Sequence, residues 1–431
     1  MKNKKNIEII TLGCAKNIVD SERLIRQLNA HNFNIVSNSD EADTIIINTC
    51  GFINPAKEES INTILNAIEL KKNKKIEKVI VAGCLSARYS KELKKEIPEV
   101  DAFLGTEDYA GILKELNLDL KNNLLGERII TTPKHYAYLK ISEGCDNPCS
   151  FCAIPLMRGR HKSFPIEKLK TEAESLVRKG VKELIIIGQD TTDYGKDIYG
   201  KRNLAELLNE LSEIENLEWI RLLYAYPSHF PVDVMKEIRE NPKICNYIDL
   251  PLQHISDSVL KSMRRGITKK STINLIEKLR SEIPGLTLRT TFIVGYPNEG
   301  EKEFKELYNF IEETEFDRIG VFKYSQEDDT YSYNMGDPIP DEMKEERLAS
   351  LMELQSKISL NKNKKLVGKE LKIVIDEVQD NYYIGRSERD TPEVDGEIMI
   401  SKNNSKLQEG EFYTIQITDA DEYDLYGEIP S

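Results

Sequence analysis

Residues 143–155 read EGCDNPCSFCAIP and hold three of the seven cysteines of the chain, Cys145, Cys149 and Cys152. Spacings of four and three residues between cysteines arise by chance on the order of 10⁻³ times in a chain of this composition. A structural zinc site is the competing interpretation, but it normally takes four protein ligands in paired spacing. The next cysteine downstream, Cys245, falls within the strand-like KICNYIDL and is predicted to be a core thiol. Three cysteines on one short segment are therefore a strong signal, and a structural zinc site does not explain them well.

The segment around this motif, residues 131–365, alternates apolar strand-like runs with helical patterns. Six strand–helix units in succession predict a parallel α/β barrel that is not fully closed. The three cysteines follow the first strand, at the carboxyl end, where barrels of this kind carry their active sites. The six predicted strands are YAYLKIS, ELIIIG, WIRLLYA, YIDLPLQ, TLRTTFIVG and RIGVFKYS.

The first segment, residues 1–130, also alternates strands and helices and predicts an open parallel α/β sheet. Its strand-like runs IEIITLGC, DTIIINTC and KVIVAGC each end in a cysteine: Cys14, Cys50 and Cys84. A single cysteine there would be interpreted as a small buried residue. Three at equivalent points of one parallel sheet meet at its carboxyl edge and favour a shared iron-sulfur or zinc site.

The last segment, residues 366–431, changes to short alternating strands after a long helical pattern, which predicts a small antiparallel β-barrel of OB-like kind. The predicted strands are ELKIVIDEV, YYIGRSE, GEIMIS and EFYTIQITDA. This segment has 6 basic and 16 acidic residues and so accounts for −10 of the net charge of −13. The other two segments are nearly neutral.

Length and composition fit a three-domain, acidic, soluble protein of 431 residues. The first residues have no apolar run of signal-peptide kind, and about 18 consecutive apolar residues occur nowhere. We therefore expect a cytoplasmic protein with no membrane association. In a reducing compartment an odd number of cysteines favours ligands and buried thiols over disulfides.

These motifs resemble a known family. Cys145, Cys149 and Cys152, with Phe151 before the last, look like the signature of radical S-adenosylmethionine enzymes. Further motifs resemble methylthiotransferases across nearly the whole chain, most closely those that modify an aspartate of a ribosomal protein. The last segment resembles a TRAM domain. The motifs are TLGCAKNIVDSERL, INTCGF, VAGC, EGCDNPCSFCAIPLMRGRHKS, IGQDTTDYG, YIDLPLQH, TLRTTFIVGYPNE and EYDLYG.

The resemblance implies two 4Fe-4S clusters and S-adenosyl-L-methionine as cofactors. It assigns an auxiliary cluster to Cys14, Cys50 and Cys84 and a radical-generating cluster to Cys145, Cys149 and Cys152. It implies that sulfur is held and methylated at the auxiliary cluster, while a 5′-deoxyadenosyl radical made at the other cluster activates the substrate carbon. Phe151, Gln189 and Gly295 are expected near S-adenosylmethionine.

The resemblance and the charge together predict the substrate. An RNA-binding barrel is expected to be basic, and this one is strongly acidic, which favours a basic ribosomal protein over tRNA. We therefore expect a methylthio group to be added to the β-carbon of an aspartate in the decoding-centre protein of the small ribosomal subunit, with an external electron donor. The alternatives are the same chemistry on a tRNA adenosine, and a non-catalytic iron-sulfur electron carrier or RNA-tethering module.

The sequence does not settle the roles of three other side chains. Arg158 and Arg160 fit a salt-bridged surface as well as an active site. His254 ends a predicted barrel strand, which favours a place in the site.

Overall fold

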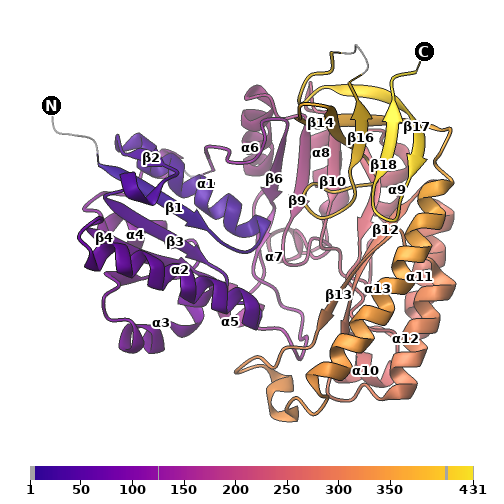
Figure 1. Ribbon diagram of the computed structural model, residues 1–431, viewed down its shortest axis with the longest axis horizontal. Coiled ribbons are helices and arrows are strands. Elements are labelled where there is room, and N and C mark those ends of the chain that lie inside the picture. Colours follow the sequence, from indigo (N-terminus) through magenta and orange to yellow (C-terminus); the bar gives the residue numbers. More distant parts are fainter. Residues whose placement is uncertain (1–4, 125, 403–405, 431) are drawn as a thin grey trace.

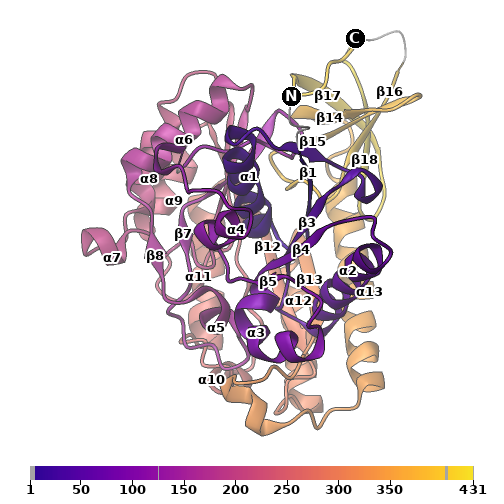
Figure 2. The same cartoon turned by 90° about the vertical axis from the view of Figure 1, so that its left-hand side faces the viewer.

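The computed structural model describes residues 5–124, 126–402 and 406–430, and it has three parts arranged along the chain (Figure 1). An α/β unit at the amino terminus and a small β-barrel at the carboxyl terminus contact different regions of a central α/β unit. Figure 2 shows the first unit from its outer side. Within the described ranges, no helix is both long and apolar enough to cross a membrane.

The amino-terminal unit contains five parallel strands in the order β2-β1-β3-β4-β5. Every residue of the central strand β3 is buried, as its apolar sequence TIIINT predicts. The strands are β1 (Asn6–Thr11), β2 (Asn34–Val36), β3 (Thr44–Thr49), β4 (Lys78–Gly83) and β5 (Ala102–Phe103). The helices are α1 (Ala15–Ala30), α2 (Asn54–Lys72), α3 (Cys84–Glu96) and α4 (Tyr109–Glu115).

The central unit is a sheet of six parallel strands in the order β13-β12-β11-β10-β9-β6. In the described residues β6 and β13 are its two edges, so the barrel is open, as predicted. The strands are β6 (Tyr136–Lys140), β9 (Glu183–Ile187), β10 (Trp219–Leu222), β11 (Ile244–Asp249), β12 (Thr287–Val294) and β13 (Arg318–Lys323).

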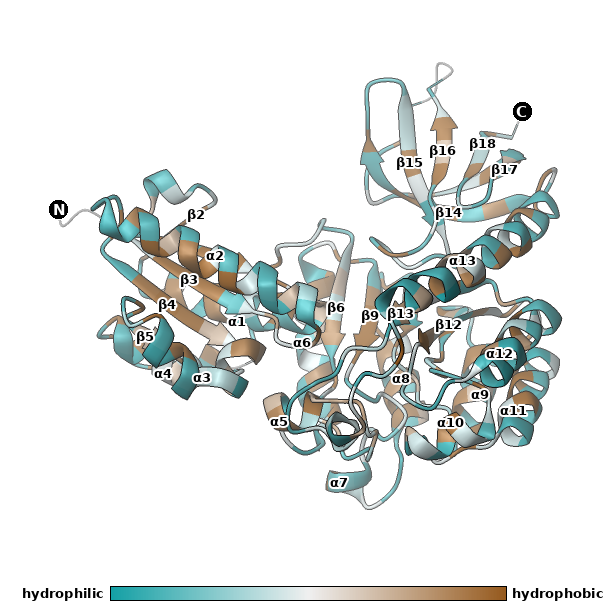
Figure 3. Cartoon of the chain, turned by 60° about the horizontal axis from the view of Figure 1, so that its bottom comes forward, coloured by the Kyte–Doolittle hydropathy of each residue, from teal (hydrophilic) through white to brown (hydrophobic). Residues whose placement is uncertain are grey.

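Helices cover the outside of this sheet. Their apolar faces and the strands form the largest core, whereas their outer faces are polar (Figure 3). The main helices are α6 (Ile166–Arg178), α8 (Leu204–Ser212), α9 (Val232–Glu240), α11 (Lys269–Glu282), α12 (Glu301–Thr314) and α13 (Asp341–Lys364). Shorter elements are β7 (Ser142–Glu143), α5 (Ile154–Arg158), β8 (Lys162–Ser163), α7 (Lys196–Tyr199) and α10 (Asp257–Ser262).

The carboxyl-terminal unit is a closed five-stranded barrel in the order β14-β15-β16-β18-β17. Four of its strands match the sequence prediction, and the fifth, β18, begins within the quoted motif EYDLYG. The strands are β14 (Glu370–Val378), β15 (Tyr382–Ser387), β16 (Ile398–Ser401), β17 (Phe412–Ala420) and β18 (Leu425–Glu428). The predicted fold class of all three units is confirmed.

This β-barrel packs against the amino-terminal ends of the central strands. Trp219, at the start of β10, meets Phe412 of β17 edge to face, with ring centroids 4.8 Å apart. Several acidic residues of the barrel pair with basic residues of the central unit. The pairs are Asp376–His135 at 2.7 Å, Asp390–Arg318 at 2.6 Å, Asp395–Arg289 at 3.4 Å and Glu411–Lys182 at 2.6 Å. Part of the acidic charge therefore holds the barrel in place.

Candidate active site

One cavity of about 350 Å³ lies between the amino-terminal and central units, and six cysteines line it. It lies at the carboxyl ends of both parallel sheets, the position at which α/β sheets bind ligands. Cys14, Cys50 and Cys84, here called the strand-end cysteines, line one side. Cys145, Cys149 and Cys152, here called the loop cysteines, also line it. The two sets predicted from the sequence therefore share one site.

The strand-end cysteines lie on connections that lead from a strand of the sheet to the following helix, here called junctions. Cys14 precedes the first residue of α1, Cys50 follows β3 and Cys84 is the first residue of α3. The side-chain amide of Asn17 donates to the carbonyls of Leu12 and Thr49, at 2.6 and 3.2 Å, and so ties the first two junctions. Cys14 and Cys84 lie at helix amino termini, where the helix dipole favours negative charge.

Two glycines allow these junctions to approach closely. A Cβ on Gly13, whose φ is +91°, would lie 2.7 Å from the Cβ of Cys50 and 3.0 Å from its sulfur. A Cβ on Gly51 would lie 2.8 Å from the backbone of Leu85, next to Cys84. Neither position has room for a larger residue, and Gly13 also needs the left-handed backbone that glycine adopts without strain. The site therefore depends on glycine at both positions.

The loop cysteines come from one connection of the central unit, between β7 and α5. The amide of Cys145 donates to the carbonyl of Gly159 at 3.2 Å, and the amide of Cys152 donates to the carbonyl of Cys149 at 3.2 Å. Arg265 donates from Nη1 to the Cys149 sulfur at 3.2 Å. A short loop with its own hydrogen bonds thus sets the relative positions of these three thiols.

One strand-end cysteine contacts the chain segment that follows the loop cysteines. Cys84 packs in a small buried cluster with Ala153, Ile154 and Met157, which follow Cys152 in the chain. A strand-end cysteine is therefore in apolar contact with the segment that carries the loop cysteines. This contact crosses the boundary between the two units.

Burial disfavours the ionised form of these thiols when no metal is bound. It raises the pKa of Cys84, Cys145 and Cys152 to about 12, and it also raises the pKa of Cys50. Metal centres bind thiolates, so assembly of a cluster here has to release protons. Compact sets of three soft thiol ligands suit iron-sulfur clusters better than hard cations.

A buried charge network lies beside the cavity. Arg158 donates to Glu143 at 2.6 Å, to Asp20 at 3.2 Å and to the Asn17 side chain at 2.5 Å. Of the two arginines that the sequence left open, Arg158 lines the cavity and is buried. Arg160 is exposed and pairs with Asp146 at 3.1 Å.

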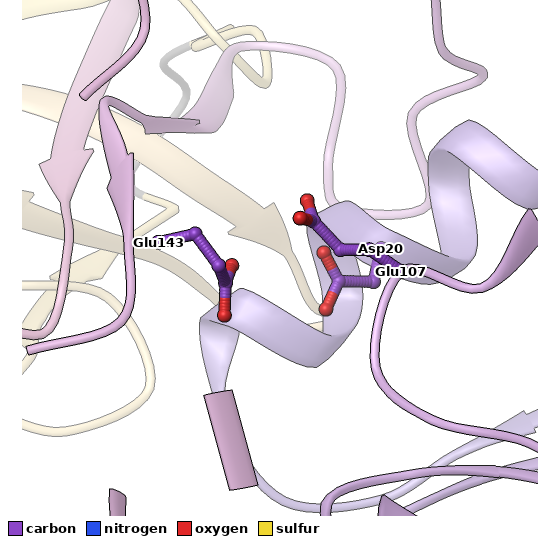
Figure 4. Close-up of side chains that lie close together, drawn as sticks. All are labelled: Asp20, Glu107 and Glu143. Atoms are coloured by element: carbon purple, nitrogen blue, oxygen red, sulfur yellow. The ribbon is translucent and has the colours of Figure 1, made fainter. Parts of the chain in front are cut away.

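Three carboxylates of this network, from Asp20, Glu107 and Glu143, point toward one another (Figure 4). Their spacing alone would suit a metal ion. However, the Lys140 ammonium contacts all three: Asp20, Glu107 at 2.7 Å and Glu143 at 2.8 Å. The group is therefore an ion-pair cluster between the two units, since Asp20 and Glu107 belong to one and Lys140 and Glu143 to the other.

Of the three residues predicted to lie near S-adenosylmethionine, two line the cavity and the third does not. Phe151 and Gln189 line the cavity. Both polar atoms of the Gln189 side chain are buried, and neither has a hydrogen-bond partner among the described residues. Gly295 is not among the described residues that line the cavity, and its amide donates to Glu299 at 3.1 Å. Its predicted role near S-adenosylmethionine stays a prediction.

His254 also lies outside the cavity wall formed by the described residues. It is fully buried, with Nδ1 accepting from the Ser256 amide at 3.0 Å and Nε2 3.3 Å from Glu299. Glu299 in turn pairs with Arg347 at 2.8 Å. His254 therefore supports the packing below the strand ends, and the expectation of a place in the site does not hold for this geometry.

Several cavity residues were not singled out from the sequence. Lys16 lies two residues after Cys14, inside a quoted motif, and Gln253 lies inside YIDLPLQH, so both carried a signal. Arg265 carried none, because it is brought to Cys149 from a loop 116 residues away. Tyr224 and Tyr226 follow β10; Tyr224 lies inside the predicted strand WIRLLYA, and Tyr226 comes directly after it. Burial lowers the pKa of Lys16 to about 8.

Comparisons with known proteins agree with this geometry. Residues 6–105 match the uncharacterized protein family UPF0004, residues 139–311 the radical SAM superfamily and residues 367–429 the TRAM domain. Two solved structures share the fold at low identity. The radical S-adenosylmethionine methyltransferase TsrM of Kitasatospora setae, solved with cobalamin and a 4Fe-4S cluster, has a TM-score of 0.53 at 12% identity, covering 74% of this chain and 75% of its own. The cobalamin-dependent radical enzyme OxsB has a TM-score of 0.52 at 15% identity, covering 80% and 56%.

Curated relatives are much closer in sequence. The ribosomal protein uS12 methylthiotransferase RimO of Christiangramia forsetii is 52% identical over 99% of this chain and 94% of its own length. The proteins of the same name from Chloroherpeton thalassium and Bacteroides fragilis are 52% and 50% identical over at least 99% of both chains. The resemblance inferred from the motifs is thereby confirmed. The chain belongs to the ribosomal protein uS12 methylthiotransferase family of radical S-adenosylmethionine enzymes.

Proposed function

We propose that this protein transfers a methylthio group to the β-carbon of an aspartate in ribosomal protein uS12. The observation that carries the proposal is the single cavity lined by both cysteine sets, one from each unit. Relatives that share half of the residues over the full length carry the uS12 methylthiotransferase name. Their enzymatic name does not favour the non-catalytic electron carrier considered from the sequence.

The donor sets fit two iron-sulfur clusters. We assign one 4Fe-4S cluster to the strand-end cysteines and the other to the loop cysteines. Each set offers three soft sulfur ligands, so each cluster would keep one iron free for another ligand. Helix amino termini at Cys14 and Cys84, and Arg265 at Cys149, place positive charge beside the sulfur atoms.

The cavity also fits S-adenosylmethionine. The buried amide of Gln189 lacks a partner in the described part of the chain, and such groups are normally satisfied by a ligand or water. Phe151 offers an apolar surface beside the loop cysteines. We propose that these two residues contact S-adenosylmethionine, and that Gly295 shapes the strand end from outside the wall.

When bound, these cofactors would supply the methylthio group and the radical that removes a hydrogen atom from the substrate carbon. The protein residues hold and shield the reactants. Asn147 donates to Asp190 at 2.7 Å and fixes the loop that carries the cysteines. Phe151, Ile154 and Met157 make the wall apolar, which limits water at a site where radicals would otherwise be quenched. The Lys140 and Arg158 network holds the two units together beside the cavity.

The substrate has to reach the cavity at the carboxyl ends of the central strands, whereas the β-barrel lies at the amino-terminal ends of those strands. None of the described cavity residues comes from residues 366–431. We propose that the remaining acidic surface of the barrel attracts the basic ribosomal protein at a distance from the chemistry. An external electron donor completes the reaction.

Mass spectrometry of uS12 tests this function. Reconstituted enzyme, S-adenosylmethionine, sulfide and a dithionite reductant are incubated with isolated uS12, and in parallel with tRNA. We expect methylthio addition on one aspartate of uS12 and none on tRNA. Modification of a tRNA adenosine with unmodified uS12 would contradict the proposal and favour the nucleic-acid alternative.

A further inference from the structure

Lys16 is a buried cation in the cavity that forms no ion pair with any described carboxylate. Its side chain lines the cavity and the residue is 7% exposed. The ammonium lies 3.0 Å from the centroid of the Tyr224 ring, a cation–π contact. Among the described residues, no carboxylate or carbonyl accepts a hydrogen bond from it. The N–H groups that do not face the ring are therefore available to a molecule in the cavity.

Of the described residues, two other cations line the cavity, and both already have partners. Arg158 donates to Asp20, Glu143 and Asn17. Arg265 donates to the sulfur of Cys149 at 3.2 Å and to the carbonyl of Pro251 at 2.5 Å, and it stacks on Tyr226. A buried ammonium without a partner is costly, because the aromatic face replaces only part of its hydration. Lys16 is thus the cation whose surroundings call for an anionic ligand.

The platform under Lys16 is held firmly. Tyr224 follows β10 with φ +57°, an uncommon conformation for a residue other than glycine. Its amide donates to Asp249 at 3.1 Å, and its carbonyl accepts from the Thr191 amide at 3.1 Å. The ring covers one face of the ammonium, so a ligand has to approach from the cavity. This geometry suits a small planar anion such as a carboxylate.

We propose that Lys16 binds the side-chain carboxylate of the substrate aspartate and so positions its β-carbon between the two cysteine sets. The inference rests on the proposed function. The β-carbon is bonded directly to the carboxyl carbon. A hydrogen bond to a carboxylate oxygen therefore restricts the position of the reacting β-carbon as well. Lys16 lies two residues from Cys14, on the side of the cavity that would present the sulfur. It is a positioning residue for the transfer step.

Binding of uS12 tests the inference independently of turnover. The probes are uS12 and uS12 with the target aspartate replaced by asparagine, titrated into reconstituted protein with S-adenosylmethionine. Wild-type protein should prefer the aspartate form by about tenfold or more, the size of a charge-assisted hydrogen bond. Lys16→Met should bind both forms equally, and Lys16→Arg should restore much of the preference. Lys72→Met, on an exposed lysine paired with Glu99, is the matched control and should keep the wild-type preference.

All variants are compared at equal iron content, so that loss of a cluster is not mistaken for loss of recognition. A Lys16→Met protein that still prefers the aspartate form would overturn the inference. A variant that keeps this preference but loses affinity for S-adenosylmethionine would assign Lys16 to the carboxylate of that cofactor, which also overturns it. Wild-type protein that neither binds nor modifies uS12 would instead refute the proposed function.

Discussion

The two cysteine sets face the same cavity but are built in different ways. The loop cysteines lie within eight residues of one connection, between β7 and α5. The strand-end cysteines span 71 positions and come from three separate strand ends. The first set is organised by local hydrogen bonds, whereas the second requires the register of a whole sheet and glycines at Gly13 and Gly51.

This difference shows where each set is vulnerable. A loop set lies on one short piece of chain, although Asp190 and Arg265 from elsewhere in the central unit also hold that loop. A strand-end set depends on residues that carry no ligand but allow backbones to approach. An ion-pair cluster and an apolar contact at Cys84 are among the contacts that join the two units and so bring both sets to one cavity.

Removing one ligand from each set should have the largest effect. We expect Cys50→Ser and Cys149→Ser each to reduce bound iron to about half and to abolish methylthio transfer, because each proposed cluster depends on its three thiolates. Iron and sulfide analysis with electron paramagnetic resonance measures the loss. Full iron content in either variant would contradict the assignment of that set.

Weakening the boundary between the two units should have the next largest effect. Lys140→Met removes the cation between three carboxylates, and we expect the free energy of unfolding to fall by about 3–5 kcal/mol at neutral pH. Each set lies within its own unit, so iron content should persist while transfer declines. Lys72→Met, at an exposed ion pair, should cost less than about 1 kcal/mol.

The pH dependence of stability tests the same ion-pair cluster in a second way. Burial raises the pKa of Asp20, but the charges of Lys140 and Arg158 outweigh it, so the pKa of the folded state is lowered. The stabilisation is present above the unfolded-state pKa of about 4 and is lost as pH falls through the folded-state value. The stability curves of wild type and Lys140→Met, from denaturant unfolding, should therefore converge below about pH 4. A constant difference down to pH 2 would contradict this role.

Replacing a residue that is not itself a ligand should affect only the strand-end set. Gly13→Ala places a Cβ against Cys50 in a left-handed backbone, and we expect a loss of about 1–3 kcal/mol together with the iron of the strand-end set alone. Gly180→Ala is the control, since Gly180 has φ +105° but no atom within 4 Å of the added Cβ. It should cost about 1 kcal/mol and leave iron unchanged. Equal iron in both variants would show that the close approach at Gly13 is not needed.

Substitution of the seventh cysteine, Cys245, should have the smallest effect on iron content and transfer. Cys245 is 1% exposed in an apolar cluster to which all three units contribute, as predicted for a core thiol. Cys245→Ala should leave both iron content and transfer unchanged and should lower stability by about 1 kcal/mol. Loss of iron in this variant would show that the two sets do not account for all ligands.

Much of the fold could be predicted because its signals are local. Apolar runs such as TIIINT and ELIII formed buried parallel strands, and glycine-bounded alternating runs formed the small barrel. The loop cysteines could be found from spacing alone. Arg265 could not, since only folding brings it to Cys149. His254 was expected in the site because it ends a strand, but its side chain turns toward Glu299.

The sequence by itself determined the ligand types, the two sets of three cysteines and the order of the three units, because these follow from residue identity and periodicity. The tertiary structure decided that both sets share one cavity and that Lys16 is a cavity cation with no ion pair to a described carboxylate. It decided, too, that Arg158 is buried while Arg160 is exposed. It also decided that the acidic barrel lies away from the cavity and uses part of its charge in internal ion pairs. The physical reason is that composition counts charges, whereas burial and pairing depend on which surfaces meet.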